Sequence, residues 1–222
     1  MKTTLNRREA LRTTASTGLA AAFGVRALDL LGEDAQAATT TCLLSPEVTE
    51  GPYWIEESFT RRDIREKRPG LPLAIRFTVL DARSCAIIKN ADVEIWHCDA
   101  SGVYSGVNGA STHFLRGHQR TNAKGKAEFL TIFPGWYPGR TPHIHMKVSV
   151  GGNVVHTGQV FFNEAISRKV YAHAPYRGAY DTPHAQDMIY AQAGGSTAEL
   201  KLTKRTGTLK GYLGTIAIGV AT

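Results

Sequence analysis

Short runs of alternating apolar and polar residues, separated by turn residues, follow one another along most of this chain. Side chains of a strand point to opposite faces in turn, so Leu73–Asp81, apolar at every second position, predicts a strand with one buried face. Gly151-Gly152 is typical of a tight hairpin. About seven or eight such strands predict an all-β fold, a two-sheet antiparallel β-sandwich with long loops and little helix. The further strands are expected over Ala91–Cys98, Lys126–Phe133, His143–Val150, Asn153–Phe162, Glu199–Lys204 and Leu209–Val220.

Two segments lack strand periodicity and are expected to lie outside the sheets. Residues 38–70 are rich in turn and charged residues, which predicts an N-terminal arm laid over a sandwich of residues 71–222. Residues 166–192 are polar and interrupted by proline, which predicts an excursion with at most short helix. Long excursions on a rigid sandwich often form the rims of binding clefts.

The first residues have the order of an export signal. Arg7-Arg8 precede a weakly apolar stretch over residues 13–25, and Ala35-Gln36-Ala37 has the small-residue pattern of a cleavage site. Paired arginines before a mild apolar stretch predict a twin-arginine-type signal over residues 1–37, an address for exporting proteins that have already folded. We therefore expect an extracellular or periplasmic protein. No later apolar run approaches the length of a membrane span.

The composition argues against nucleic acid as a partner and leaves the pairing of the cysteines open. With 42% hydrophobic residues, the 222-residue chain can bury one sizeable core. The net charge is +7, but the basic residues are scattered and form no run interleaved with aromatics, which argues against nucleic acid as a partner. The chain has 3 cysteines, so Cys85 and Cys98 could pair and leave Cys42 over. Alternatively, Cys98 is a small buried apolar residue.

A histidine pair at the start of one predicted strand is the first sign of chemistry. His143 and His145 are two residues apart, so both imidazoles point to one face and can reach one metal ion. Taken alone, the pair is weak evidence, because two half-exposed strand histidines give the same pattern. Immediately upstream, residues 134–142 predict a rigid, proline-rich loop that returns Tyr137 and Arg140 toward the same strand end.

Two segments around these residues resemble the intradiol ring-cleavage dioxygenases. They are Val93–Ser105 and Pro134–Val148, within a resemblance that extends over residues 49–162. Phenolate is a hard, anionic donor that favours the ferric state, whereas imidazole serves many transition metals, so the tyrosines suit such a site to iron. The resemblance implies a β-sandwich that holds Fe(III) through two tyrosinates and two histidines, at the matching positions Tyr104, Tyr137, His143 and His145.

The resemblance also implies a reaction and further site residues. A catechol-type aromatic diol would chelate the iron, displace hydroxide and Tyr137, and react with O2. The ring would open between the two hydroxyl-bearing carbons and give a muconate-type diacid. Arg140 matches an arginine of this family that stabilises the charge on the activated substrate ring. Gln159 matches a polar pocket position and Tyr53 a segment that borders the cleft, so both are expected to bind substrate.

The remaining histidines are expected to have structural or surface roles. His97 follows Trp96 in a buried strand pattern, which favours structural hydrogen bonds over metal ligation. The others lack a partner at ligand spacing and are expected at the surface or on the cleft rim: His113, His118, His156, His173 and His184.

Two functions of other classes remain open. The first is a non-catalytic extracellular β-sandwich binding module that retains the metal site, although the intact tyrosines, histidines and Arg140 argue against it. The second is a zinc or copper hydrolase that uses the histidine pair, although phenolates are unusual zinc ligands. The sequence leaves the identity of the diol and the oligomeric state open.

Overall fold

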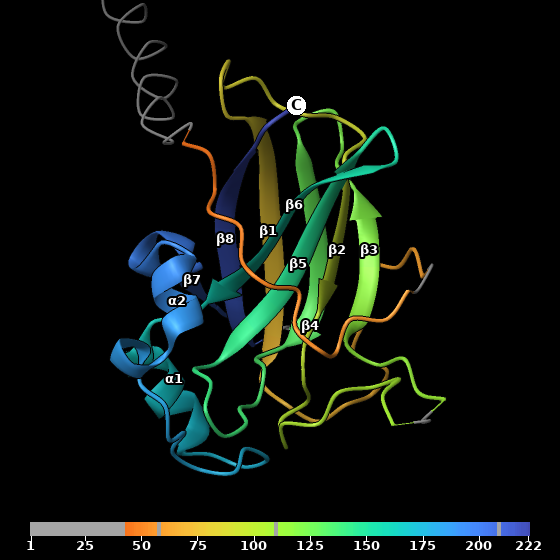
Figure 1. The fold of residues 1–222 in the computed structure, drawn as a ribbon. Coiled ribbons are helices and arrows are strands. Elements are labelled where there is room, and N and C mark those ends of the chain that lie inside the picture. The colour runs from red at the N-terminus through yellow and green to blue at the C-terminus, as the bar shows by residue number, and fades with distance from the viewer. Residues whose placement is uncertain (1–42, 57–58, 109–110, 208–209) are drawn as a thin grey trace, which may run out of the picture. The chain divides into compact units, whose positions relative to one another are not determined.

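The computed structural model describes residues 43–56, 59–108, 111–207 and 210–222 (Figure 1). The expected export signal over residues 1–37 and its cleavage site lie outside these ranges, as does Cys42. In the described ranges, no helix is both long enough and apolar enough to cross a bilayer.

Two sheets of four strands are packed against each other (Figure 1). The first has the order β4-β1-β8-β7 and the second the order β3-β2-β5-β6. The described strands are β1 (Pro72–Asp81), β2 (Asp92–Trp96), β3 (Arg116–Arg120), β4 (Lys126–Ile132), β5 (His143–Val150), β6 (Asn153–Phe161), β7 (Lys201–Arg205) and β8 (Gly211–Val220). The helices are short and follow β6: α1 (Glu164–Tyr171), η2 (His184–Gln186), α2 (Met188–Gln192) and η3 (Gly195–Ala198). The predicted sandwich with little helix is confirmed.

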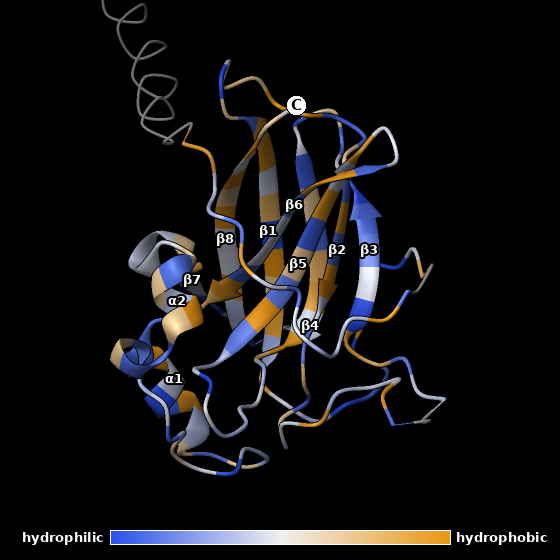
Figure 2. Cartoon of the chain, in the orientation of Figure 1, coloured by the Kyte–Doolittle hydropathy of each residue, from blue (hydrophilic) through white to orange (hydrophobic). Residues whose placement is uncertain are grey.

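Two features of the sheets differ from the prediction. β1 and β8 run parallel, with Ile75 opposite Gly214, so this ladder is not antiparallel. Alternation along a strand predicts which face is buried, but it does not specify the direction of the neighbouring strand. The second difference is β3, which has no apolar alternation and is hydrophilic along its length (Figure 2). It forms because its backbone pairs with β2, a contact that needs no apolar side chain.

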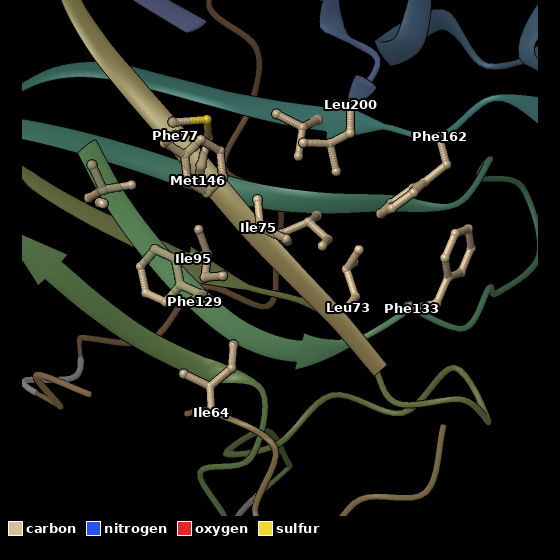
Figure 3. Packing of buried hydrophobic residues seen from close by; sticks show 14 of the residues in the cluster. Ile64, Leu73, Ile75, Phe77, Ile95, Phe129, Phe133, Met146, Phe162 and Leu200 are labelled. Carbon is tan, nitrogen blue, oxygen red and sulfur yellow. The ribbon is translucent and has the colours of Figure 1, made fainter. Parts of the chain in front are cut away.

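The core lies between the sheets and is built from the inward-facing positions of their strands. Phe77 of β1, Ile95 of β2 and Met146 of β5 are fully buried there (Figure 3). Burying an apolar side chain of this size stabilises the fold by about 1.5–3 kcal/mol. Because alternate residues of β5 point inward, His143 and His145 lie on the opposite, outer face of the same sheet.

The N-terminal arm covers this outer face. The Gln159 side chain donates to the Thr49 carbonyl oxygen at 3.1 Å. Lys147 Nζ lies 2.6 Å from Glu50 Oε2 and 3.4 Å from the centre of the Trp54 ring. The arm also forms bridges to the edge strands β3 and β4, which protects these edges from pairing with another chain. The histidine face of β5 is therefore enclosed between the sheet and the arm.

Cys98 and His97 have structural roles beneath the outer face. Cys98 is a free, buried thiol, so the Cys85–Cys98 disulfide does not form, and Cys98 packs beside Tyr104 as a small apolar residue. His97 Nδ1 lies 2.8 Å from the Cys98 carbonyl oxygen, and His97 Nε2 lies 2.6 Å from Thr131 Oγ1. The predicted structural hydrogen bonds of His97 are confirmed.

Candidate metal centre

The four side chains predicted as metal ligands bring their donor atoms together. Tyr137 Oη lies 3.0 Å from His143 Nε2, which lies 3.1 Å from His145 Nε2. His145 Nε2 in turn lies 3.1 Å from Tyr104 Oη. Ligands bound about 2 Å from one metal ion have donor atoms separated by about this much. The tertiary structure thus brings the two phenol oxygens and two imidazole nitrogens to one point.

The two tyrosines reach this point from separate loops that touch each other. Tyr104 follows β2, and Tyr137 lies in the loop between β4 and β5. The loops meet at Gly102, where φ is +83° and an added Cβ would lie 2.4 Å from the Trp136 carbonyl oxygen. Only glycine combines this backbone conformation with so close an approach. The contact holds the two loops side by side, next to the residues that carry the two phenols.

Hydrogen bonding and burial hold the two imidazoles in a metal-binding form. His143 Nδ1 lies 2.7 Å from the Thr141 carbonyl oxygen, so it carries the proton and leaves a lone pair on Nε2. The His145 ring stacks on Trp96, with ring centres 5.1 Å apart. Burial lowers the pKa of His143 to about 3 and that of His145 well below its ordinary value. Both rings are therefore neutral at pH 7.

Burial also acts on the two phenols. It raises the pKa of Tyr104 well above its ordinary value and that of Tyr137 to about 12. Ionisation of these phenols at neutral pH therefore requires a nearby positive charge, which a metal ion supplies. Among the described residues, no group of three or more His, Cys, Asp or Glu side chains could hold a metal, so a site here depends on the tyrosines. Two phenolates and two neutral imidazoles fit a hard, trivalent ion.

Arg140 lies beside the four donor atoms and is held from two sides. Its Nη2 atom donates to Gln159 Oε1 at 2.5 Å, and its Nε atom donates to Asp187 Oδ2 at 2.9 Å. The Nη1 atom lies 3.4 Å from His143 Nε2. Because the guanidinium is planar and two of its edges are engaged, the direction of Nη1 is fixed toward the donor atoms.

Asp187 was not among the residues predicted from the sequence. It is only 3% exposed, accepts the Thr141 backbone N–H at 3.0 Å, and caps α2 by accepting the Ile189 N–H at 2.9 Å. Burial by itself would raise the pKa of Asp187, but the charge of Arg140 and the Thr141 N–H outweigh it and hold that pKa below its ordinary value. The sequence near Asp187 indicates only an aspartate directly before a short apolar helix, which is typical of a helix N-cap and does not predict the contact with Arg140.

Both residues predicted to bind substrate lie at the site. Tyr53 stacks on Tyr104 with ring centres 4.3 Å apart and meets the edge of Tyr137 at 5.9 Å. Gln159 pairs with His145 across the β5–β6 ladder, and its side chain contacts Arg140. The arm therefore contributes an aromatic wall, and β6 contributes an amide.

The other histidines do not join the four donor atoms. His118 Nδ1 lies 2.8 Å from Asp92 on the neighbouring strand, and His184 Nδ1 lies 3.4 Å from Glu199. His156 is 2% exposed, so its predicted surface position is wrong. It pairs with the buried Val148 of β5 and, two residues before Gly158, points toward the inside of the sandwich.

Comparison with known proteins shows the family to which the chain is related. Residues 48–167 match the family model described as dioxygenase. An intradiol ring-cleavage dioxygenase from Tetranychus urticae is 36% identical, with a TM-score of 0.76 over 81% of this chain and 95% of that chain. The dioxygenase domain of a carbohydrate-binding fusion from Streptomyces sp. SirexAA-E is 27% identical, with a TM-score of 0.62 over 81% of this chain and 99% of that chain.

A curated relative matches over a shorter stretch. Catechol 1,2-dioxygenase 1 of Acinetobacter lwoffii is 35% identical over 103 residues, which are 42% of this chain and 32% of that protein. The chain therefore matches about a third of the length of this relative. The fold and the family match place the chain among the dioxygenases, a family of oxidoreductases. More narrowly, the chain belongs to the intradiol ring-cleavage dioxygenase family.

Proposed function

We propose that this chain holds Fe(III) and uses O2 to open a catechol-type aromatic diol between its two hydroxyl-bearing carbons. Both oxygen atoms would be retained in a muconate-type diacid. The observation that carries the proposal is the meeting of two phenol oxygens and two imidazole nitrogens at one buried point: Tyr104, Tyr137, His143 and His145.

Bound iron would supply a Lewis-acidic centre to which both oxygens of the diol bind. Three protein ligands are suited to remain in place while the diol binds. His143 and His145 project from a central strand, which holds their positions. Tyr104 is 5% exposed and lies beneath the ring of Tyr53. These ligands would hold the iron in every state of the enzyme.

Tyr137 is suited to a different role. It lies in a proline- and glycine-containing loop and is only half-buried, so it can move with less disturbance of the core than Tyr104. We assign Tyr137 as the ligand that a chelating diol displaces. Its oxygen would then be a base beside the diol and would accept one of the two hydroxyl protons.

Arg140 would act on the substrate. Its Nη1 atom points toward the donor atoms because Asp187 and Gln159 engage the rest of the guanidinium. A positive charge fixed in this position stabilises negative charge that develops on the diol ring. Asp187 would act through Arg140 and is therefore a positioning residue.

The test is oxygen uptake by the iron-loaded chain in the presence of catechol, hydroxyquinol or protocatechuate. We expect one O2 to be consumed per diol, and we expect 18O2 to place both labelled atoms in a ring-opened diacid. The Tyr104→Phe/Tyr137→Phe variant should lose uptake, whereas Tyr212→Phe, which changes a tyrosine outside the site, should retain it. Iron binding without uptake for any diol would contradict the proposal and favour a non-catalytic binding module.

A further inference from the structure

A second cavity lies apart from the metal centre. Its volume is 780 Å³, within the range of about 300–1,000 Å³ that is usual for small-molecule sites. It is lined by the first residues of β1, by the end of α1 with the turn that follows, and by the facing ends of β7 and β8. None of its lining residues belongs to the metal centre described above. We call it the α1–β8 pocket.

The floor of the α1–β8 pocket is apolar and continuous with the core. Val170 and Tyr176 are 5% and 9% exposed and belong to the main core cluster. Tyr176 Oη accepts the Leu71 backbone N–H at 2.9 Å and donates to the Phe133 carbonyl oxygen at 2.9 Å, so the ring is fixed in place. A preformed floor lowers the entropic cost of binding a ligand. The apolar lining residues are Leu71, Pro72, Val170, Pro175, Tyr176 and Tyr212.

The rim of the same pocket is cationic. No Asp or Glu lines it, and its basic residues are Lys169, His173, Lys204, Arg205 and Lys210. Elsewhere, Arg62 and Arg76 each form a salt bridge with Glu128. Within the described part of the chain, none of the pocket's lysines or its arginine has a carboxylate within salt-bridge distance. Positive charges around a concave, apolar surface concentrate a positive electrostatic potential inside it.

Protection of a sheet edge explains only part of this charge. β7 is an edge strand, and Lys204 and Arg205 discourage its pairing with another sheet. That role does not require Lys169 and His173 on the facing segment after β6, or Lys210 at the start of β8. The cations therefore gather around the pocket rather than along the strand.

We propose that the α1–β8 pocket binds an aromatic carboxylate, with its ring on the apolar floor and its carboxylate at the cationic rim. Aromatic rings contribute a large apolar contact area, and ammonium and guanidinium groups form charge-assisted hydrogen bonds with carboxylates. A bare phosphate fits less well, because it would leave the floor unused. The C-terminal end of α1 also faces the pocket, and Lys169 in its last turn counters the partial negative charge there. The proposal does not rest on the ring-cleavage reaction.

Isothermal titration calorimetry of the iron-loaded chain with 2-naphthoate tests the proposal. We expect binding that weakens as NaCl is added, and binding weaker by about tenfold or more for uncharged 2-naphthamide and for inorganic phosphate. Lys204→Glu/Lys210→Glu should weaken 2-naphthoate binding by a similar factor. Lys89→Glu/Lys124→Glu is the matched control, since it changes the net charge equally at two exposed lysines outside the pocket. It should leave the affinity within about twofold.

A blocking variant provides an independent test. Ala174 is exposed and lines the pocket, so Ala174→Trp should fill the space and abolish binding while the thermal unfolding midpoint stays near that of the wild type. Equal loss in both double variants would show an effect of overall charge and overturn the proposal. Equal affinity for the amide or for phosphate would also overturn it. So would displacement of 2-naphthoate by anaerobic catechol, because the probe would then be bound at the metal centre.

Discussion

Asp187 accepts a hydrogen bond from Arg140 Nε at 2.9 Å and another from the Thr141 backbone N–H at 3.0 Å. The same carboxylate caps α2. The excursion after β6 therefore holds the loop that enters β5, and with it the guanidinium beside the four donor atoms of the candidate metal centre. An aspartate 47 residues away in the sequence thus sets the orientation of Arg140.

Asp187→Asn should retain iron but lower kcat by about tenfold to a hundredfold. Asparagine can still cap α2, but it offers Arg140 no charged acceptor, and loss of such a contact costs about 1.5–3 kcal/mol. Turnover and iron content of the purified variant check this. If Asp187 acts through Arg140, adding the change to an Arg140→Leu protein should have little further effect on turnover. Fully additive losses would contradict the positioning role.

Arg140→Leu should keep iron bound and reduce turnover by about a hundredfold to a thousandfold, because one preorganised electrostatic donor is removed from the substrate. Arg140→Lys should rescue activity only in part, since an ammonium group cannot contact Asp187 and Gln159 as a planar fork does. Iron content and steady-state kinetics with a reactive diol provide the measurement. Near-normal activity of the leucine variant would overturn the role assigned to Arg140.

The two tyrosines should differ in their spectra. We expect the iron-loaded protein to be coloured by charge transfer from tyrosinate to iron, and both Tyr104→Phe and Tyr137→Phe should shift the visible band. Anaerobic catechol should make the Tyr137→Phe spectrum match that of the wild-type complex more closely than the Tyr104→Phe spectrum does, because we assign Tyr137 alone as the ligand that the diol displaces. A colourless wild type, or a double variant with unchanged colour and oxygen uptake, would disprove the bis-tyrosinate site.

Gly102→Ala should weaken iron binding without changing a ligand. The new Cβ would lie 2.4 Å from the Trp136 carbonyl oxygen and push the two tyrosine loops apart. Gly152→Ala is the matched control, because its φ is +88° and nothing lies within 4 Å of the added Cβ. Both variants carry the backbone strain of about 1–2 kcal/mol, but only Gly102→Ala should lose iron more readily to a chelator. Equal iron retention would show that this contact does not set the site.

We propose that the protein is exported by the signal over residues 1–37, which lie outside the described part of the structure. N-terminal sequencing of secreted material should find a start at or near Ala38. Arg7→Lys/Arg8→Lys should block export, because a receptor reads the paired arginines rather than the net charge. Material that begins at Met1, or that stays in the cytoplasm with both arginines intact, would remove the case for export.

The sequence by itself determined the strands whose side chains alternate and the faces they expose. Alternation along His143–Val150 predicts β5 with the bounds it has, and the same period places His143 and His145 on one face. Together with the proline-rich loop over residues 134–142, this period also predicted that Tyr137 and Arg140 would lie near the two histidines. These features are local, since they depend on backbone geometry over a few residues.

Tertiary structure alone decided which distant segments meet. It paired β8 with β1 in parallel and made a strand of the hydrophilic β3. It also left Cys98 as a free thiol and brought Asp187 to Arg140. Such contacts leave no period or motif in the chain, because they arise when separate segments satisfy each other's backbone groups and charges in a shared, buried space.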